Sequence, residues 1–284
     1  MTAVRALWWS LAGIVVVVAI FVGISLAWST YKGEPLPLAD HCTATVKGAT
    51  ATIDPEQARN AAIIAGVSVK RGLEPRAASI ALATAFQESD IRNLDYGHSD
   101  SLGLFQQRPS QGWGTAKQVM DPWYSSKQFY RALVKVKKWQ TRDLNDVAQA
   151  VQRSAYPEAY RKHVDRARVL ASSLTGQTPA SFTCVVNNPA AADPDGMKAF
   201  LTKTLGNTIS VSTAKDGLTV TTKHPQDAWA VANEAIAAGG GYGLSTVQVG
   251  DATWTHSTTQ EAQWSSTAPS AATEVHLGFG TATR

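Results

Sequence analysis

The feature that most constrains this chain is an uncharged N-terminal segment that runs from Ala6 to Thr30. Its part from Leu7 to Trp28 is almost wholly apolar and carries tryptophans near both ends. Twenty-two residues at about 1.5 Å each span the hydrocarbon layer, which is roughly 30 Å thick, and tryptophan favours both interfaces. The segment therefore predicts an N-terminal transmembrane helix, and we assign residues 1–30 to a membrane anchor.

A cleaved signal peptide is the alternative, because Ser25-Leu26-Ala27 resembles a small-x-small cleavage site. The apolar core is longer than that of a typical signal peptide, which favours an uncleaved anchor. Arg5 precedes the segment, whereas Lys32 and Glu34 cancel each other after it. This positive-inside bias predicts a single-pass protein of the cell membrane whose bulk lies outside the cytoplasm.

The chain has two cysteines, Cys42 and Cys184, which stand at the two edges of its central region. A disulfide formed in an oxidising compartment explains this placement better than two unpaired thiols. We predict no metal site and no cofactor, because no second cysteine or histidine lies at ligand spacing.

Composition and charge bear on the possible partners. The 284 residues, of which 44% are apolar and 17% charged, leave room for a membrane segment and two small domains. The formal net charge of +4 makes nucleic acid a partner to consider. The densest basic run, Lys135-Val136-Lys137-Lys138, has no interleaved aromatic residues and is typical of the solvated face of a helix. Nucleic acid is therefore not an expected partner.

Local signals predict a mostly α-helical domain over residues 52–174, after a short stem over 31–51. Asp54-Pro55-Glu56-Gln57 supplies an N-cap, a first-turn proline and a capping-box glutamine, which open a helix that runs to Gly72. A second helix is predicted from Pro75 to Glu88. Further along, we expect an irregular hairpin over 93–107 and helices over 122–139, 143–155 and 157–173.

A linker over residues 175–195, rich in proline and asparagine, separates a C-terminal unit over 196–284. Strands are predicted at 208–213 and 218–222 around Lys215-Asp216-Gly217, and again over 246–255 and 273–279. Helical spacing of apolar residues predicts a helix from Pro225 to Ala238. These elements predict a small α+β domain whose role the sequence does not give.

The C-terminal unit shows no arrangement of acid, base and nucleophile. His224, Asp227 and His256 lack the spacing of a peptidase site and are more simply turn or edge residues. Trp254 and Trp264 fit either stacking on sugar rings or burial in the core.

The motif that carries chemistry is centred on Glu88, which follows the apolar run from Ala77 to Phe86 and precedes Ser89. Fifteen residues after Glu88 comes Gly103-Leu104-Phe105-Gln106. A carboxyl group at a helix end against an apolar wall stays protonated near neutral pH, as a general acid that cleaves a glycosidic bond must. Taken alone, a glutamate at this position is most simply a surface carboxylate at a helix end. Together with Ser89 and Gly103-Leu104-Phe105-Gln106, it is better interpreted as a general acid.

These motifs, together with the distal Ala155-Tyr156, resemble those of the soluble lytic transglycosylase and goose-type lysozyme superfamily. The family signature is Glu-Ser, Gly-Leu-Met/Phe-Gln and Ala-Tyr-Asn, and here Pro157 stands in place of the final asparagine. The longer string from Asp100 to Thr115 resembles an actinobacterial branch of membrane-anchored wall proteins. The resemblance covers roughly residues 52–174. It implies a lysozyme-like fold with a small β-hairpin and cleavage of the MurNAc-GlcNAc β-1,4 bond of peptidoglycan, a polymer that suits the mild positive charge.

The resemblance also implies roles for individual residues. Glu88 would be the catalytic acid, and the residues expected to bind the sugar are Ser89, Leu104, Phe105, Gln106, Tyr156 and Tyr160. The two tyrosines, four positions apart, would share one face of a helix, and a place in the core is the alternative for both.

The mechanism depends on the number of carboxylates. Hydrolysis by the usual routes needs two, whereas a lytic transglycosylase needs one. Asp100 is the possible second carboxylate, and its alternative role is to cap a turn, because Gly97-His98-Ser99-Asp100 is rich in turn formers. We therefore expect a lytic transglycosylase with Glu88 as both acid and base, and a lysozyme-type hydrolase is the other enzymatic possibility.

A second functional class is a non-catalytic lysozyme-like module that binds glycan. Such a module would position a wall-spanning protein partner through its C-terminal domain. Glu88 is the residue that separates the two classes, because a binding module has no need of a catalytic acid.

Overall fold

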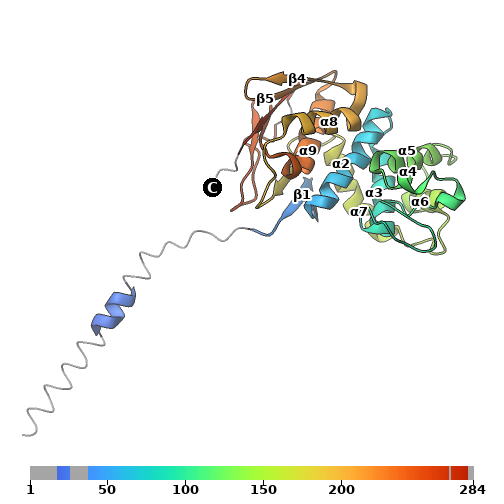
Figure 1. Cartoon of the computed structure of the whole chain (residues 1–284), viewed down its shortest axis with the longest axis horizontal. Coiled ribbons are helices and arrows are strands. Elements are labelled where there is room, and N and C mark those ends of the chain that lie inside the picture. Colours follow the sequence, from blue (N-terminus) through green and yellow to red (C-terminus); the bar gives the residue numbers. More distant parts are fainter. Residues whose placement is uncertain (1–17, 26–37, 269, 281–284) are drawn as a thin grey trace, which may run out of the picture. The chain divides into compact units, whose positions relative to one another are not determined.

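The computed structural model describes residues 18–25, 38–268 and 270–280 of two units, Met1–Leu36 and Pro37–Arg284 (Figure 1). The described part of the first unit is helical over 18–25. No helix among the described residues has the length and apolar character needed to cross a membrane. Among the described residues, this corrects the prediction of a transmembrane helix. The predicted span was Leu7 to Trp28, and its residues 7–17 and 26–28 lie outside the described residues.

The second unit is a mixed α+β fold with two antiparallel sheets. This corrects the predicted fold class, which joined a mostly α-helical domain with one small hairpin to a small α+β domain. The expected hairpin over 93–107 is instead a series of turns with one isolated bridge, between Leu102 and Gln107. The β-structure near the helices comes from segments that the sequence assigned to the stem and the linker.

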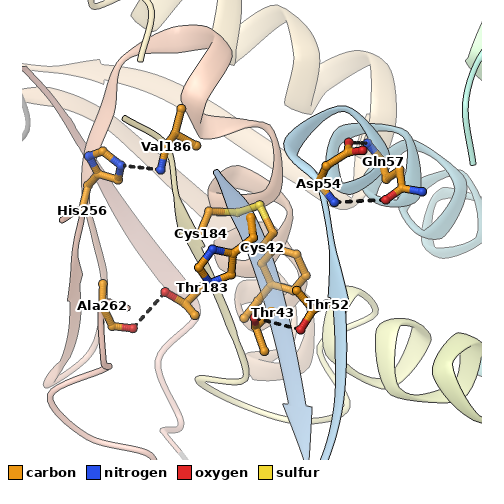
Figure 2. Close-up of a disulfide and its surroundings, with 12 residues drawn as sticks. Cys42, Thr43, Thr52, Asp54, Gln57, Thr183, Cys184, Val186, His256 and Ala262 are labelled. Atoms are coloured by element: carbon orange, nitrogen blue, oxygen red, sulfur yellow. Dashed lines mark hydrogen bonds between the residues drawn. A yellow bond between two sulfur atoms is a disulfide. The ribbon is translucent and has the colours of Figure 1, made fainter. Parts of the chain in front are cut away.

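The first sheet has the strand order β2-β1-β3, formed by β1 (His41–Val46), β2 (Ala49–Ile53) and β3 (Phe182–Val185). Cys42 lies directly opposite Cys184 in the pairing of β1 with β3. The two cysteines form a disulfide with 4.0 Å between their α-carbons, which confirms the predicted bond (Figure 2). Two segments of the chain that are 142 residues apart are thus joined at a buried position.

The helices between these strands begin where the sequence supplies caps. In α2 (Pro55–Lys70), Asp54 accepts a hydrogen bond from the Gln57 amide at 2.9 Å, and Gln57 accepts one from the Asp54 amide at 3.0 Å. This is the predicted capping box. The remaining helices of this region are α3 (Pro75–Ser89), α4 (Ala116–Val119), α5 (Pro122–Leu133), α6 (Leu144–Gln152) and α7 (Val164–Leu174), with short 3-10 turns at Pro109–Gln111 and Arg161–His163.

The second sheet has the strand order β4-β5-β8-β6-β7. The hairpin of β4 (Ile209–Ala214) with β5 (Gly217–Thr222) and the strand β8 (Glu274–Phe279) are as predicted. The strand expected over 246–255 is instead a hairpin of β6 (Leu244–Val249) and β7 (Ala252–Thr255), because Gly250 takes a positive φ of 57° and turns the chain. The helices α8 (Pro194–Leu205) and α9 (Pro225–Gly239) precede β4 and β6, with 3-10 turns at Gly206–Thr208 and Gly240–Tyr242.

Helix α9 joins the two halves of the second unit. It contacts α2 on one side and the strands β5, β6 and β8 on the other (Figure 1). Trp254 and Trp264 are both buried, and their indole nitrogens donate to Thr183 at 2.9 Å and to the Phe182 carbonyl at 3.1 Å. Of the two roles considered for these tryptophans, stacking on sugar rings and burial in the core, the structure supports burial in the core. Their hydrogen bonds connect β3 to the C-terminal elements.

Candidate functional site

Glu88 lies in the last turn of α3, where the backbone leaves the helix through an unusual conformation. Asp90 and Ile91 both take positive φ, 53° and 56°, although neither is glycine. A β-branched residue such as isoleucine rarely adopts this region. Two amides of α2 hold the strained exit, because Gln57 Nε2 donates to the Asp90 carbonyl at 2.7 Å and Asn60 Nδ2 to the Ile91 carbonyl at 2.9 Å. Backbone strain of this kind is characteristic of functional sites.

Ser89 fixes the end of α3 to the turn that contains the second motif. Its hydroxyl lies 2.7 Å from the Leu104 carbonyl oxygen and 3.2 Å from the Ala85 carbonyl oxygen. The turn itself requires glycine at Gly103, where φ is 74° and a β-carbon would lie 2.8 Å from the Val119 carbonyl oxygen. The predicted Glu-Ser and Gly-Leu-Phe-Gln motifs are thus in direct contact, and Ser89 acts there through the backbone.

The carboxyl group of Glu88 is half-buried and receives hydrogen bonds from two side chains. Tyr160 Oη donates to Glu88 Oε1 at 2.8 Å, and the Gln152 side chain makes the second bond. Burial raises the pKa of Glu88 above its usual value, and the two hydrogen bonds lower it by a smaller amount. The net direction favours the protonated acid, as the helix-end position against an apolar wall predicts.

Gln152 connects Glu88 with the turn as well. Its Nε2 donates to the Phe105 carbonyl at 2.8 Å, so one amide side chain contacts both motifs. No sequence pattern singled out Gln152, because it is the last residue of an ordinary amphipathic helix, α6. Its partners Glu88 and Phe105 are distant in the sequence and are brought to it by the fold. Gln152 is the main site residue that the sequence did not reveal.

Gln152 also lines a cavity of about 810 Å³. The lining also includes Trp113, Lys135 and Arg153. A cavity of this size accommodates a small ligand or part of a polymer. Because Gln152 belongs to the cavity and bonds to Glu88, the acid is one side chain away from this space.

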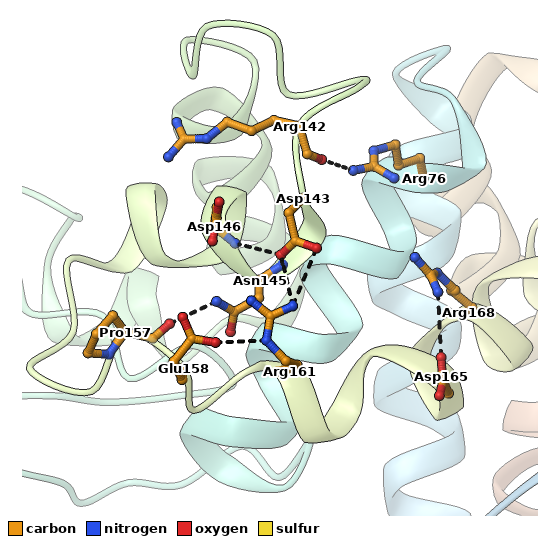
Figure 3. Close-up of polar contacts among 10 residues, drawn as sticks. All are labelled: Arg76, Arg142, Asp143, Asn145, Asp146, Pro157, Glu158, Arg161, Asp165 and Arg168. Atoms are coloured by element: carbon orange, nitrogen blue, oxygen red, sulfur yellow. Dashed lines mark hydrogen bonds and ion pairs between the residues drawn. The ribbon is translucent and has the colours of Figure 1, made fainter.

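The segment that carries Tyr160 is held to α6 by polar contacts (Figure 3). Asn145 Nδ2 donates to the Pro157 carbonyl at 2.9 Å, and the Arg161 guanidinium lies 3.4 Å from the Asp143 carboxylate. These contacts flank Tyr160 on both sides in the sequence. They therefore orient the chain that presents its hydroxyl to Glu88.

The two tyrosines do not share a helix face, which corrects that expectation. Residues 156–160 form turns, and the side chains have opposite environments. Tyr156 is 76% exposed and Tyr160 is fully buried. Of the two tyrosines, Tyr160 is the one that bonds to Glu88 among the contacts of the described residues. Tyr156 stays a predicted sugar-binding residue that the chain presents to solvent.

The side chains of the Gly103-Leu104-Phe105-Gln106 motif also differ in whether they are buried or exposed. Leu104 and Phe105 are buried, and Phe105 stacks on Phe129 with 4.6 Å between the ring centroids. Gln106 is partly exposed at a positive φ of 47°, and its Nε2 donates to the Tyr96 carbonyl at 3.2 Å. Sugar contact by this motif would therefore involve Gln106 or the backbone, since the two apolar side chains belong to the core.

Asp100, the possible second carboxylate, is engaged in local contacts. Its oxygens accept hydrogen bonds from Arg108 Nε at 2.7 Å, from the Ser110 amide at 2.7 Å and from the Ser110 hydroxyl at 3.0 Å. The Arg108 side chain and the Ser110 amide hold the pKa of Asp100 well below its usual value. This arrangement is that of a turn-capping aspartate.

Within the described ranges, no group of three or more histidine, cysteine or acidic side chains is placed to hold a metal ion. His256, considered in the sequence with His224 and Asp227, is buried and accepts a hydrogen bond from the Val186 amide at 3.3 Å (Figure 2).

Comparison with known proteins adds no assignment to this geometry. No protein-family model matches the chain, and none of the curated proteins matches it.

Proposed function

We propose that this chain is an extracytoplasmic enzyme that cleaves the MurNAc-GlcNAc β-1,4 bond of peptidoglycan, and that it does so as a lytic transglycosylase. The observation that carries the proposal is the Glu88 carboxyl, which is half-buried, has a raised pKa and bonds to Tyr160 and Gln152 beside a cavity. The motifs around it are those that resemble the transglycosylase superfamily. The Cys42–Cys184 disulfide supports an oxidising compartment.

The proposed reaction uses the same carboxyl group twice. Protonated Glu88 gives its proton to the bridging oxygen, and the bond from that oxygen to the anomeric carbon breaks. The Glu88 carboxylate then takes the proton of the muramyl 6-hydroxyl as that oxygen bonds to the anomeric carbon. The product carries a 1,6-anhydro ring, no water is consumed, and Glu88 is protonated again at the end.

The contacts of Asp100 favour this route over hydrolysis by two carboxylates. Both Asp100 oxygens are bonded to Arg108 or Ser110. A carboxylate that acts as base or nucleophile must instead reach the scissile bond or the attacking water. Tyr160 and Gln152 carry no charge at neutral pH and would position Glu88.

The first test replaces Glu88 in the full-length protein and measures digestion of purified sacculi. Glu88→Gln keeps the side-chain shape and removes the proton donor, so activity should fall by about a hundredfold to ten-thousandfold. Glu74→Gln is the matched control, because Glu74 is an exposed glutamate at the other end of α3 that makes no side-chain cap. More than a tenth of the activity left in Glu88→Gln would assign the acid to another residue. Binding of sacculi without release of any fragment by the unmodified protein would favour the glycan-binding module.

The second test identifies the product by mass spectrometry of the released muropeptides. We expect 1,6-anhydromuramyl ends, and the same ends with modestly reduced yield from Asp100→Asn. Reducing ends whose formation depends strongly on Asp100 would instead indicate a hydrolase with two carboxylates.

A further inference from the structure

A second cavity, of about 440 Å³, is lined by residues of three helices. They come from the C-terminal end of α2, the N-terminal part of α5 and the C-terminal end of α8. Its charged lining consists of four cationic side chains and one carboxylate, namely Lys70, Arg71, Lys127, Lys203 and Asp121. Four positive charges and one negative charge leave +3 in one concavity, against +4 for the whole chain. We call this cavity the basic pocket.

The walls of the basic pocket are fastened to one another. Lys203 Nζ lies 3.1 Å from Asp121 Oδ2 and 3.7 Å from the centroid of the Trp123 ring, so α8 and α5 are joined across the pocket. Trp123 Nε1 donates to Thr204 at 2.9 Å, and Lys70 Nζ donates to the Lys203 carbonyl at 3.0 Å. The pocket is therefore a built feature of the tertiary structure.

Three of the four cations, Lys70, Arg71 and Lys127, lack an anionic partner among the described residues. Lys127 is exposed and takes part in no ion pair there, and neither does Arg71. Arg71 Nε is buried and has no hydrogen-bond partner in the described part of the chain. Most of the positive charge in the basic pocket is therefore not neutralised by a protein carboxylate.

The chemistry of the lining specifies the kind of ligand. A concave surface of one sign of charge concentrates the potential and favours an anion. A single carboxylate would neutralise only one of the three excess charges, whereas a phosphate monoester or a diphosphate brings two or more. Guanidinium and ammonium groups together are the usual donors to phosphate oxygens.

The remaining lining and the volume indicate that the ligand is larger than phosphate itself. Val67 and Tyr124 complete the wall near Trp123, and most of the exposed surface of the pocket is apolar. Pockets of this size hold a small organic molecule. We propose that the basic pocket binds a multiply charged phosphate group, as a monoester or diphosphate, that is attached to an organic body. This site is separate from Glu88 and does not depend on the proposed cleavage reaction.

Isothermal titration of the full-length protein with inorganic pyrophosphate tests the proposal, with acetate as the singly charged comparison at equal ionic strength. We expect pyrophosphate to bind and acetate not to bind. Lys127→Gln should weaken pyrophosphate binding by about tenfold or more, the effect of losing one charge-assisted hydrogen bond. Lys137→Gln is the matched control, because it removes the same charge from an exposed position outside the pocket.

The source of the phosphate group is tested with phosphatidylcholine vesicles, with and without phosphatidic acid. If the protein cosediments with vesicles only when phosphatidic acid and Lys127 are both present, the phosphate group is borne by a lipid. If the protein binds pyrophosphate but does not cosediment with the vesicles, the ligand is soluble. Absence of binding to both probes would overturn the proposal. Equal weakening by Lys127→Gln and Lys137→Gln would also overturn it, because it would reveal general surface attraction.

Discussion

At the scale of single residues, the environment of Glu88 sets its proton affinity through opposing effects. Burial raises the pKa, and hydrogen bonds from Tyr160 and Gln152 lower it. Tyr160 is itself buried, and burial raises the pKa of its phenol, so it stays a neutral donor. The site therefore holds an acid whose pKa can be shifted by changing one neighbour.

Tyr160→Phe removes the hydrogen bond that favours the ionised form of Glu88, so the pKa of Glu88 should rise further. Because the proposed first step needs protonated Glu88, the loss of activity at alkaline pH should move to higher pH. The measurement is the pH profile of sacculus digestion. Tyr156→Phe, at an exposed tyrosine in the same segment, should leave the profile in place. An unchanged profile in Tyr160→Phe would show that Glu88 does not govern the alkaline limb.

At the scale of elements, strand β1 is connected to the rest of the second unit through β2, β3 and the disulfide. Cys42 and Cys184 are opposite one another in the β1–β3 pairing, and both are buried. The bond closes a loop with a sequence separation of 142 residues. Its main effect is to reduce the entropy of the unfolded chain, with a ceiling of about 5 kcal/mol for so long a loop.

Cys42→Ser and Cys184→Ser should each lower the free energy of unfolding by a similar amount, up to a few kcal/mol. The double variant should be no less stable than either single variant, because all three lose the same cross-link. Urea denaturation of the three proteins measures this. A double variant whose loss is the sum of the two single losses would contradict the prediction.

At the scale of the whole second unit, the contact between α2 and α9 contains a buried acid. Glu234 of α9 is fully buried, and neither carboxyl oxygen has a hydrogen-bond partner among the described residues. It lies against Gly66 of α2, where a β-carbon would be 2.7 Å from Glu234 Oε2. Burial raises the pKa of Glu234 well above its usual value, so the folded state keeps this side chain protonated.

Glu234 should make the protein less stable as pH rises. Below the ordinary pKa of 4.5 both states hold the proton, and the contribution of Glu234 to stability is at its highest. Between that value and the raised pKa, only the folded state holds it, so the free energy of unfolding falls by about 1.4 kcal/mol per pH unit. Glu234→Gln should remove this slope and stabilise the protein at neutral and alkaline pH.

Urea unfolding at about pH 5 and about pH 8 measures the effect of Glu234. Glu74→Gln, at an exposed glutamate, should keep the pH dependence of the unmodified protein. The same slope in Glu234→Gln as in the unmodified protein would mean that another group is responsible.

The sequence by itself determined the features whose causes are local. Asp54 and Gln57 predicted the start of α2, Pro225 and its apolar spacing predicted α9, and Lys215-Asp216-Gly217 predicted the β4–β5 hairpin. Capping bonds, proline and turn residues act within a few positions, so they can be recognised without knowing the fold. The position of Glu88 at a helix end, next to Ser89, was predictable for the same reason.

Only the tertiary structure decided which distant segments meet. It brought Phe182–Val185 beside His41–Val46 to complete a sheet, where the sequence showed only a stem and a linker. It placed Gln152 on Glu88 and buried Tyr160 while exposing Tyr156. Neighbouring residues in the chain do not encode such differences, because burial and hydrogen-bond partners depend on segments far away in the sequence. The raised pKa of Glu234 has the same origin, since it arises from the packing of α9 against α2.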